Sequence, residues 1–217
     1  MTIIQMHEKA DLLMDKAGAP WFNALEKDVF INMAQYEFVK REARQFEINE
    51  EARQNLGTIV LLHTVTAISQ NLDLLTRFAY VGALSATYTD ECGKTKTSPV
   101  SPMQWDDYWN SLRDPFNKPT NKYPIHLLYF NGTNRALDIK GITGTFISGI
   151  LTYIKKPVEV LNDEVTPANN VNCELPEFVH DEVVNIAVRK MLAIAKDPNY
   201  QAQINEIINQ QSLNPKL

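Results

Sequence analysis

The fold of this chain depends most on the stretch Tyr153–Ala195, which reads YIKKPVEVLNDEVTPANNVNCELPEFVHDEVVNIAVRKMLAIA. A strand ends at Pro157, a polar loop follows, and Pro176 opens a helix at a position where its missing N–H costs nothing. Apolar residues then recur every three or four positions. The pattern predicts a long C-terminal helix with a wide buried face, made of Val179, Val183, Val184, Ile186, Ala187, Val188, Met191, Leu192 and Ala195.

Helices are also predicted at the N-terminus, over residues 2–16, over 24–44 and after Asn49. Asn23 followed three residues later by Glu26 is typical of a capping box, which marks where the second helix begins. Apolar residues at helical spacing predict that this helix buries one face, formed by Leu25, Val29, Met33 and Tyr36 with Phe30, Ala34 and Phe38 alongside. Beyond Pro198 we expect a helical tail with apolar residues on one side, Ile204, Ile207 and Ile208.

The middle of the chain favours strands. Three runs are rich in β-branched and aromatic residues, over 58–67, 78–88 and 146–154. Asn131-Gly132 lies between two further apolar runs and is a strong signal for a hairpin, because both residues tolerate a positive φ. Between these strands the sequence predicts a short helix over 104–112, followed by a proline-bounded polar loop.

Together these patterns predict an α+β fold, with N-terminal helices, a central antiparallel hairpin and sheet portion, and a long C-terminal helix packed on the N-terminal ones. We expect the 217 residues to form a single structural domain. Its helical body is expected over about 1–57 and 174–210, and its β-rich portion over about 58–173.

Charge and cysteine content exclude several classes of protein. The net charge of -5 argues against a protein whose main task is to grip a phosphate backbone. Cys92 and Cys173 are too few for a disulfide framework, so we expect reduced thiols. The longest apolar run, 59–62, is far too short for a membrane span, and the first residues lack the pattern of an export signal. We therefore expect a protein made in a cytoplasm, with no membrane partner.

Residues that could carry catalysis are few. His180 lies beside Asp181 and Glu182 and could act as a general base, but adjacent residues on a helix point in different directions. His7 has only Asp11 as a weak second metal ligand, and the remaining histidines, His63 and His126, fall in apolar runs that indicate core positions. Glycine-rich phosphate loops and zinc-ligand spacings are missing from the sequence. We predict no catalytic, cofactor-binding or metal-binding residues and no cofactor.

The aromatic residues of the central helix and loop offer a different kind of site. Trp105, Tyr108, Trp109 and Phe116 could line a ligand pocket, but helical spacing favours a core or an interface. Prolines make the following loop rigid, and rigid aromatic anchors lose little entropy on contact. We predict an oligomer or partner contact at Trp105, Trp109, Asp114, Pro115, Phe116, Asn117, Lys118 and Pro119.

Stretches of the chain, taken in order, resemble one protein family. They are AQYEFV at Ala34–Val39 with FE at Phe46-Glu47, LRDPFNKP at Leu112–Pro119, and YIKKP at Tyr153–Pro157 with CELPE at Cys173–Glu177 and His180, Glu182, Val183 and Val184. The set is similar to the ring, or head-to-tail connector, proteins of crAss-like bacteriophages with short tails.

The resemblance implies a virion structural protein without enzymatic activity, assembled in the bacterial host cytoplasm. It implies self-association into a ring of about twelve copies that joins the portal protein to adjacent tail ring proteins. Genomic DNA would pass through the channel without sequence-specific binding.

Other functions stay open on the residues alone. A nucleic-acid-binding accessory protein would need one basic face, built from Lys155, Lys156, Arg189, Lys190 and Lys196. A hydrolase would use His180 with a neighbouring carboxylate.

Overall fold

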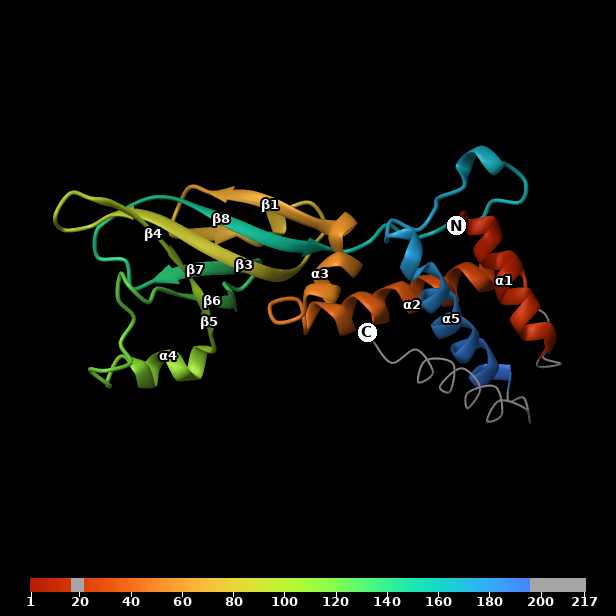
Figure 1. Cartoon of the computed structure of the whole chain (residues 1–217), viewed down its shortest axis with the longest axis horizontal. Helices are drawn as coiled ribbons and strands as arrows, with labels where there is room; N and C mark the ends of the chain where they lie inside the picture. The colour runs from red at the N-terminus through yellow and green to blue at the C-terminus, as the bar shows by residue number, and fades with distance from the viewer. Residues whose placement is uncertain (17–21, 196–217) are drawn as a thin grey trace. The chain divides into compact units, whose positions relative to one another are not determined.

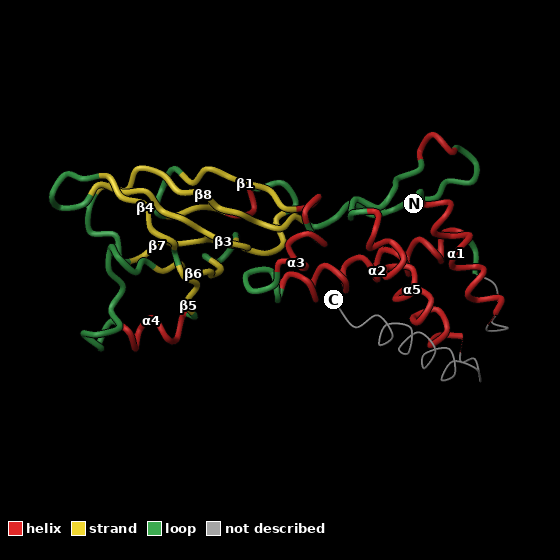
Figure 2. The backbone as a smooth tube through the Cα atoms, in the orientation of Figure 1, coloured by secondary structure: helices red, strands yellow, loops and turns green. Residues whose placement is uncertain are grey.

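The computed structural model describes residues 1–16 and 22–195. The chain divides into two compact units, a helical unit formed by Met1–Thr58 and Pro157–Leu217, and a β unit formed by Ile59–Lys156 (Figure 1). All named strands of the described chain lie in the β unit (Figure 2). The predicted α+β class is confirmed. The segment from Pro157 to Cys173, expected with the β-rich portion, groups with the helical unit.

The helical unit contains α1 (Ile3–Lys16), α2 (Ala24–Ala43), α3 (Glu50–Asn55) and α5 (His180–Ala195). Helix α5 packs against both α1 and α2, as predicted. The capping box is also confirmed, because Asn23 Oδ1 accepts from the Glu26 N–H at 2.8 Å and Glu26 Oε2 accepts from the Asn23 N–H at 2.9 Å. These contacts satisfy N–H groups that the first turn of a helix leaves without partners.

The start of α5 differs from the prediction. Pro176 has an extended backbone, with ψ of 144°, and precedes a 3-10 turn over Glu177–Val179, so the α-helix begins only at His180. The predicted buried face is confirmed by side chains that are at most 4% exposed, Val179, Val183, Val184, Ile186, Ala187, Val188, Met191 and Leu192. The Ala195 side chain and the predicted tail with Ile204, Ile207 and Ile208 lie outside the described residues.

Helix α2 buries a different face from the one predicted. Phe30, Ala34 and Phe38 are buried as expected, but Leu25, Val29 and Met33 are 66%, 57% and 47% exposed. The prediction for these three was wrong because α2 is apolar on two sides, and only one side packs against α5. Spacing alone does not tell which side of such a helix faces the core.

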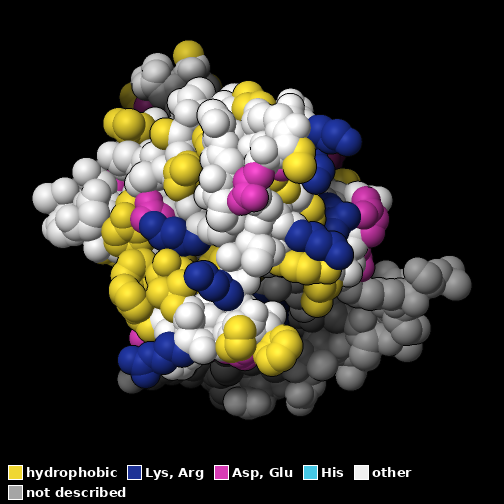
Figure 3. All heavy atoms as spheres, turned by 90° about the vertical axis from the view of Figure 1, so that its left-hand side faces the viewer, with side chains coloured by type: hydrophobic (Ala, Val, Ile, Leu, Met, Phe, Trp, Pro, Cys, Tyr) yellow, Lys and Arg dark blue, Asp and Glu magenta, His cyan; other side chains and the backbone are white. Residues whose placement is uncertain are grey.

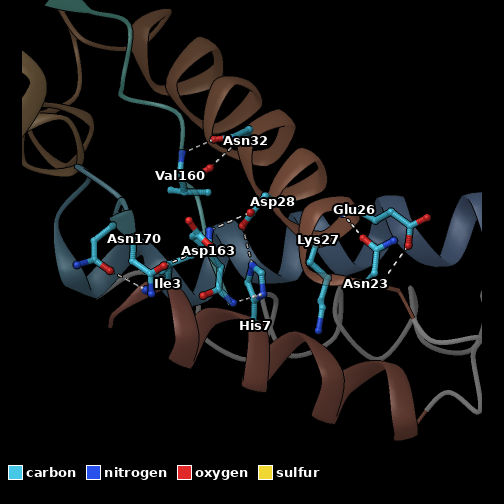
Figure 4. A network of polar contacts seen from close by, with 12 residues as sticks. Ile3, His7, Asn23, Glu26, Lys27, Asp28, Asn32, Val160, Asp163 and Asn170 are labelled. Atoms are coloured by element: carbon cyan, nitrogen blue, oxygen red, sulfur yellow. Dashed lines mark hydrogen bonds and ion pairs between the residues drawn. The ribbon is translucent and has the colours of Figure 1, made fainter. Parts of the chain in front are cut away.

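A buried polar network ties α1, α2 and the segment after Pro157 together (Figure 4). His7 on α1 points toward Asp28 on α2, with 2.8 Å between His7 Nε2 and Asp28 Oδ1. The other carboxylate oxygen of Asp28 accepts from the Asn162 N–H at 2.9 Å, and Asn162 Nδ2 lies 3.2 Å from His7 Nδ1. A carboxylate only accepts, so His7 Nε2 carries a proton and Nδ1 is left to accept from Asn162.

Asn32, one turn after Asp28 on α2, forms two hydrogen bonds from its side chain to the backbone of Val160, as a neighbouring strand would. Its Oδ1 accepts from the Val160 N–H at 2.8 Å, and its Nδ2 donates to the Val160 carbonyl at 3.1 Å. Asn32 and Asp28 therefore fix two points of the same segment, which has only an isolated bridge, between Leu161 and Val171, as β structure of its own.

The β unit consists of two four-stranded sheets. The first has the order β1 (Val60–Val65), β8 (Thr145–Lys155), β3 (Phe78–Thr89), β4 (Thr95–Pro99) and is antiparallel throughout. The second has the order β2 (Ser69–Asn71), β7 (Arg135–Lys140), β6 (Ile125–Phe130), β5 (Ser101–Met103), with β5 parallel to β6. Both sheets contribute to one hydrophobic core that includes Val65, Leu84, Leu137, Ile139 and Leu151.

The strands predicted over 58–67, 78–88 and 146–154 correspond to β1, β3 and β8, and β6 and β7 form the predicted hairpin. Strands β2, β4 and β5 were not predicted. They are three to five residues long, and their mostly polar sequences, SQN, TKTSP and SPM, have no apolar alternation. The predicted short helix is α4 (Trp105–Ser111), which follows β5 directly.

Candidate functional site

Helix α4 presents its aromatic side chains at the surface of the β unit. Trp105 and Trp109 are 42% and 53% exposed, so the core of this chain does not account for them. The Trp105 ring lies 5.3 Å from the Tyr129 ring on β6 and meets the Trp109 ring edge to face at 6.0 Å. These ring contacts hold the two indoles in place while leaving much of each accessible.

A shallow hollow of about 330 Å³ lies beside Trp105, lined by Pro102, Met103, Gln104, Trp105, His126 and Leu128. His126 is 3% exposed, and burial lowers the pKa of its imidazole. Its Nδ1 has no hydrogen-bond partner among the described residues. Of the predicted aromatic set, only Trp105 lines this hollow, so the ligand-pocket interpretation of the whole set is not supported.

Asp114 organises the loop that follows α4. Its Oδ1 accepts from the Phe116 N–H at 2.9 Å, and its Oδ2 accepts from the Asn117 side-chain amide. The hydrogen bonds from Phe116 and Asn117 lower the pKa of the Asp114 carboxyl. Aspartate bonded in this way to its own backbone two residues on forms a tight turn. The Phe116 side chain at the turn is 93% exposed.

The far end of the loop is packed against the β7–β8 connection. Gly141 has φ of 94°, and a Cβ built on it would come within 2.9 Å of Pro119. Asn121 exchanges hydrogen bonds of 2.8 Å with Thr143, and its carbonyl accepts from the Tyr88 hydroxyl at 2.6 Å. The loop is therefore fixed at both ends, and Phe116 projects from a preordered backbone.

We call Trp105, Trp109 and Asp114–Pro119 the aromatic surface. Figure 3 faces the end of the β unit and shows hydrophobic side chains at several places, with lysine and arginine side chains between them and few acidic ones. Large apolar side chains that stay exposed on an ordered surface indicate a contact with another protein. The structure thus brings all the predicted contact residues into one helix and the loop that follows it.

The hydrolase candidates are not brought together. His180 is buried; its Nε2 lies 2.8 Å from the Leu175 carbonyl and its Nδ1 lies 3.1 Å from the terminal amino group. Burial lowers the pKa of His180. The adjacent carboxylates pair elsewhere, Asp181 with Lys9 at 2.7 Å and Glu182 with Arg41 at 2.8 Å. His180 thus closes the helix start and has no carboxylate bonded to it within the described chain.

The other candidate ligands also have structural partners. Asp11 pairs with Lys27 at 2.8 Å and not with His7. No group of three or more potential metal ligands occurs within residues 1–16 and 22–195. Cys92 and Cys173 are free thiols, and burial raises the pKa of Cys173 to about 11.

Over the same described ranges, no helix is long and apolar enough to cross a membrane.

The residues of the proposed basic face are divided between the two units. Lys155 and Lys156 belong to the β unit, whereas Arg189 and Lys190 lie on α5 in the helical unit, and Lys190 pairs with Glu37. Lys196 lies outside the described residues. This arrangement gives the nucleic-acid-binding alternative no specific support.

Sequence reasoning missed the anchors of the loop. Gly141, Asn121 and Tyr88 fix its position, yet they are distant in sequence and carry no motif that pairs them. The one available signal was Gly141, two residues after the predicted strand that ends at Ile139, a place in the chain where a positive φ often requires glycine.

Comparison with known proteins gives one family. The profile of the family described as phage tail ring protein 3/4 matches residues 1–204, which include the whole β unit with the aromatic surface and most of the helical unit. No curated protein matches the chain.

Proposed function

Because this chain belongs to the phage tail ring protein 3/4 family, the crAss ring proteins whose motifs it carries, we propose that its copies close into a ring in the head-to-tail connector. Tail ring proteins are structural components of the virion tail, and this membership favours a role without catalysis. The match over residues 1–204 is the observation on which the proposal depends. The ring is proposed to contain about twelve copies.

The aromatic surface is proposed to form a contact within this assembly, either between neighbouring subunits or with an adjacent ring. A ring of identical subunits repeats one heterologous contact until it closes, so every subunit needs exposed, ordered contact groups. Phe116, Trp105 and Trp109 meet this need, because they are exposed and held by the turn at Asp114 and by ring contacts. Preordered groups lose little entropy when they bind.

We further propose that the ring joins the portal protein to adjacent tail ring proteins and surrounds the channel for genomic DNA, after assembly in the host cytoplasm. The net charge of -5 supports passage of DNA without sequence-specific binding, since an acidic protein does not hold a polyanion tightly.

The mass of the purified protein tests the proposal. Light scattering is expected to give a species of about 300 kDa, twelve times the 24.7 kDa chain, alone or after addition of portal protein. Negative-stain images should show closed rings. A Trp109→Ala, Phe116→Ala double variant should assemble poorly, whereas Leu74→Ala, at a side chain 77% exposed outside the aromatic surface, should assemble normally. A wild-type monomer indifferent to portal and virion proteins would contradict the proposal.

A further inference from the structure

Helix α2 carries an apolar line on the side that faces away from its packed side. Leu25, Val29 and Met33 follow one another four residues apart, so they lie on one line along the helix, and we call them the α2 stripe. All three are about half exposed or more, while Phe30, Ile31, Ala34, Phe38 and Val39 are at most 8% exposed. A helix that is apolar on opposite sides is usually buried on both. No described part of the chain covers the α2 stripe.

Positive charge lies just beyond the α2 stripe. Lys40 and Arg44 follow Met33 toward the end of the helix; both are exposed, and neither is ion-paired within the described residues. By contrast, Arg41 between them is paired with Glu42 and Glu182. The outward side of α2 is thus an apolar line, then Glu37, which pairs with Lys190, and then two lysine or arginine side chains that make no ion pair among the described residues.

The first turn of α4, within the aromatic surface, carries the opposite charge. Asp106 and Asp107 lie in the first turn of α4, between Trp105 and Trp109 in sequence. Both carboxylates are exposed, and they make no ion pair in the part of the chain that the structure describes. The start of α4 therefore combines apolar side chains with acids that make no ion pair among the described residues, while the loop of the aromatic surface carries the exposed Lys118. The α2 side combines apolar side chains with two bases that are likewise not ion-paired there. Such complementarity selects a partner and its orientation.

We propose that in the ring the aromatic surface of one subunit docks onto the α2 stripe of the next, with Asp106 and Asp107 toward Lys40 and Arg44. This inference rests on the proposed ring, whose closure requires two different surfaces that recognise each other. The occupant of the α2 stripe is thus a second copy of this chain. Each subunit uses its aromatic surface toward one neighbour and its α2 stripe toward the other.

A mixing experiment with the full chain tests the pairing. The stripe variant is Val29→Glu, Met33→Glu, and the aromatic variant is Trp109→Glu, Phe116→Glu. Each variant has only one functional surface, so each is expected to stay monomeric alone, with self-association weakened by about a hundredfold or more. An equimolar mixture is expected to give heterodimers with one intact contact and nothing larger, measured by light scattering and native mass spectrometry.

Matched controls exclude nonspecific effects of an added charge. Leu12→Glu, on α1 at the same 57% exposure as Val29, and Leu74→Glu, at 77% exposure in the β unit, should assemble as wild type. Far-UV circular dichroism verifies that each variant is folded. If a glutamate variant unfolds, charge-reversal variants of the exposed lysine, arginine and aspartate side chains test the pairing instead. Lys40→Glu with Arg44→Glu should weaken assembly by about tenfold, and Asp106→Lys with Asp107→Lys in the partner copy should restore it.

Different outcomes refute different statements. If wild type assembles but the two variants do not form heterodimers, the pairing of these surfaces is wrong and the proposed ring stands. If the stripe variant loses stability but still forms rings, residues 196–217 or another part of the same chain cover the α2 stripe, and the pairing is again wrong. If wild type stays monomeric even with portal protein, the ring proposal itself fails.

Discussion

Removing the carboxylate of Asp28 should be among the most destabilising changes in the helical unit. Asp28 is 4% exposed and accepts from His7 Nε2 at 2.8 Å and from the Asn162 N–H at 2.9 Å. In Asp28→Ala both donors lose their acceptor. An unsatisfied buried donor costs about 1–3 kcal/mol, and the Asn162 N–H is only partly buried, so it lies near the lower limit.

The total expected loss is about 3 kcal/mol of unfolding free energy, a large fraction of the roughly 5–15 kcal/mol that holds a domain folded. Asp28→Asn keeps one acceptor oxygen and should lose about half as much. The control is Asp181→Ala, which removes a carboxylate that is 62% exposed and pairs with Lys9 at the surface. Such exposed pairs contribute about 1 kcal/mol or less.

Urea unfolding followed by far-UV circular dichroism measures these differences, because helices dominate the signal. A double-mutant cycle with His7→Ala should show that the two losses are not additive, with a coupling of at least about 1 kcal/mol. The reasoning is refuted if Asp28→Ala is no more destabilising than Asp181→Ala, or if His7 and Asp28 show no coupling.

Other predictions concern the loop anchor, the histidines and the folding unit. Gly141→Ala should destabilise the chain by about 1–3 kcal/mol and expose the loop to proteases, because its φ is 94° and the new Cβ would meet Pro119; unchanged thermal unfolding and proteolysis would contradict this. Burial lowers the pKa of His126 and His180 below the ordinary 6.5, so below that pH the unfolded chain binds more protons and stability should fall from about pH 7 to about pH 5. Urea titrations of a His126→Gln, His180→Gln variant should give a shallower dependence, and an equal slope would count against the two histidines. We propose that residues 1–217 fold as one domain, because segments on both sides of the β unit build the helical unit; unfolding curves from circular dichroism and tryptophan fluorescence should coincide, and two separate transitions would disprove it.

The sequence predicted elements well where local chemistry decides them. The capping box at Asn23 and Glu26 and the hairpin at Asn131-Gly132 depend on residues a few positions apart, and both are present. The buried face of α5 could also be predicted, because its apolar residues lie on one broad side. Local signals of this kind do not depend on what the rest of the chain does.

Elements that depend on distant partners could not be predicted. Strand β4 has no apolar alternation, and it is a strand because β3 pairs with it from Ser85 to Thr89. The exposed side of α2 has a related cause, since Leu25, Val29 and Met33 are as apolar as the residues that pack. For the candidate site, residues 105–119 were proposed from aromatic and proline content, but the contacts that fix the loop at Gly141 and Asn121 were not predicted.

The chain enters and leaves the β unit through adjacent strands, because Val60 on β1 lies opposite Ile154 on β8. Neighbouring positions of an antiparallel pair are only about 5 Å apart, so the whole β unit is inserted at a single point between the two halves of the helical unit. A segment attached in this way can be lengthened, shortened or replaced without moving the two backbone ends that it connects, because these ends lie close together. Relatives can therefore be expected to differ most in the inserted segment, and a purification tag placed at the β6–β7 turn should leave the helical unit intact.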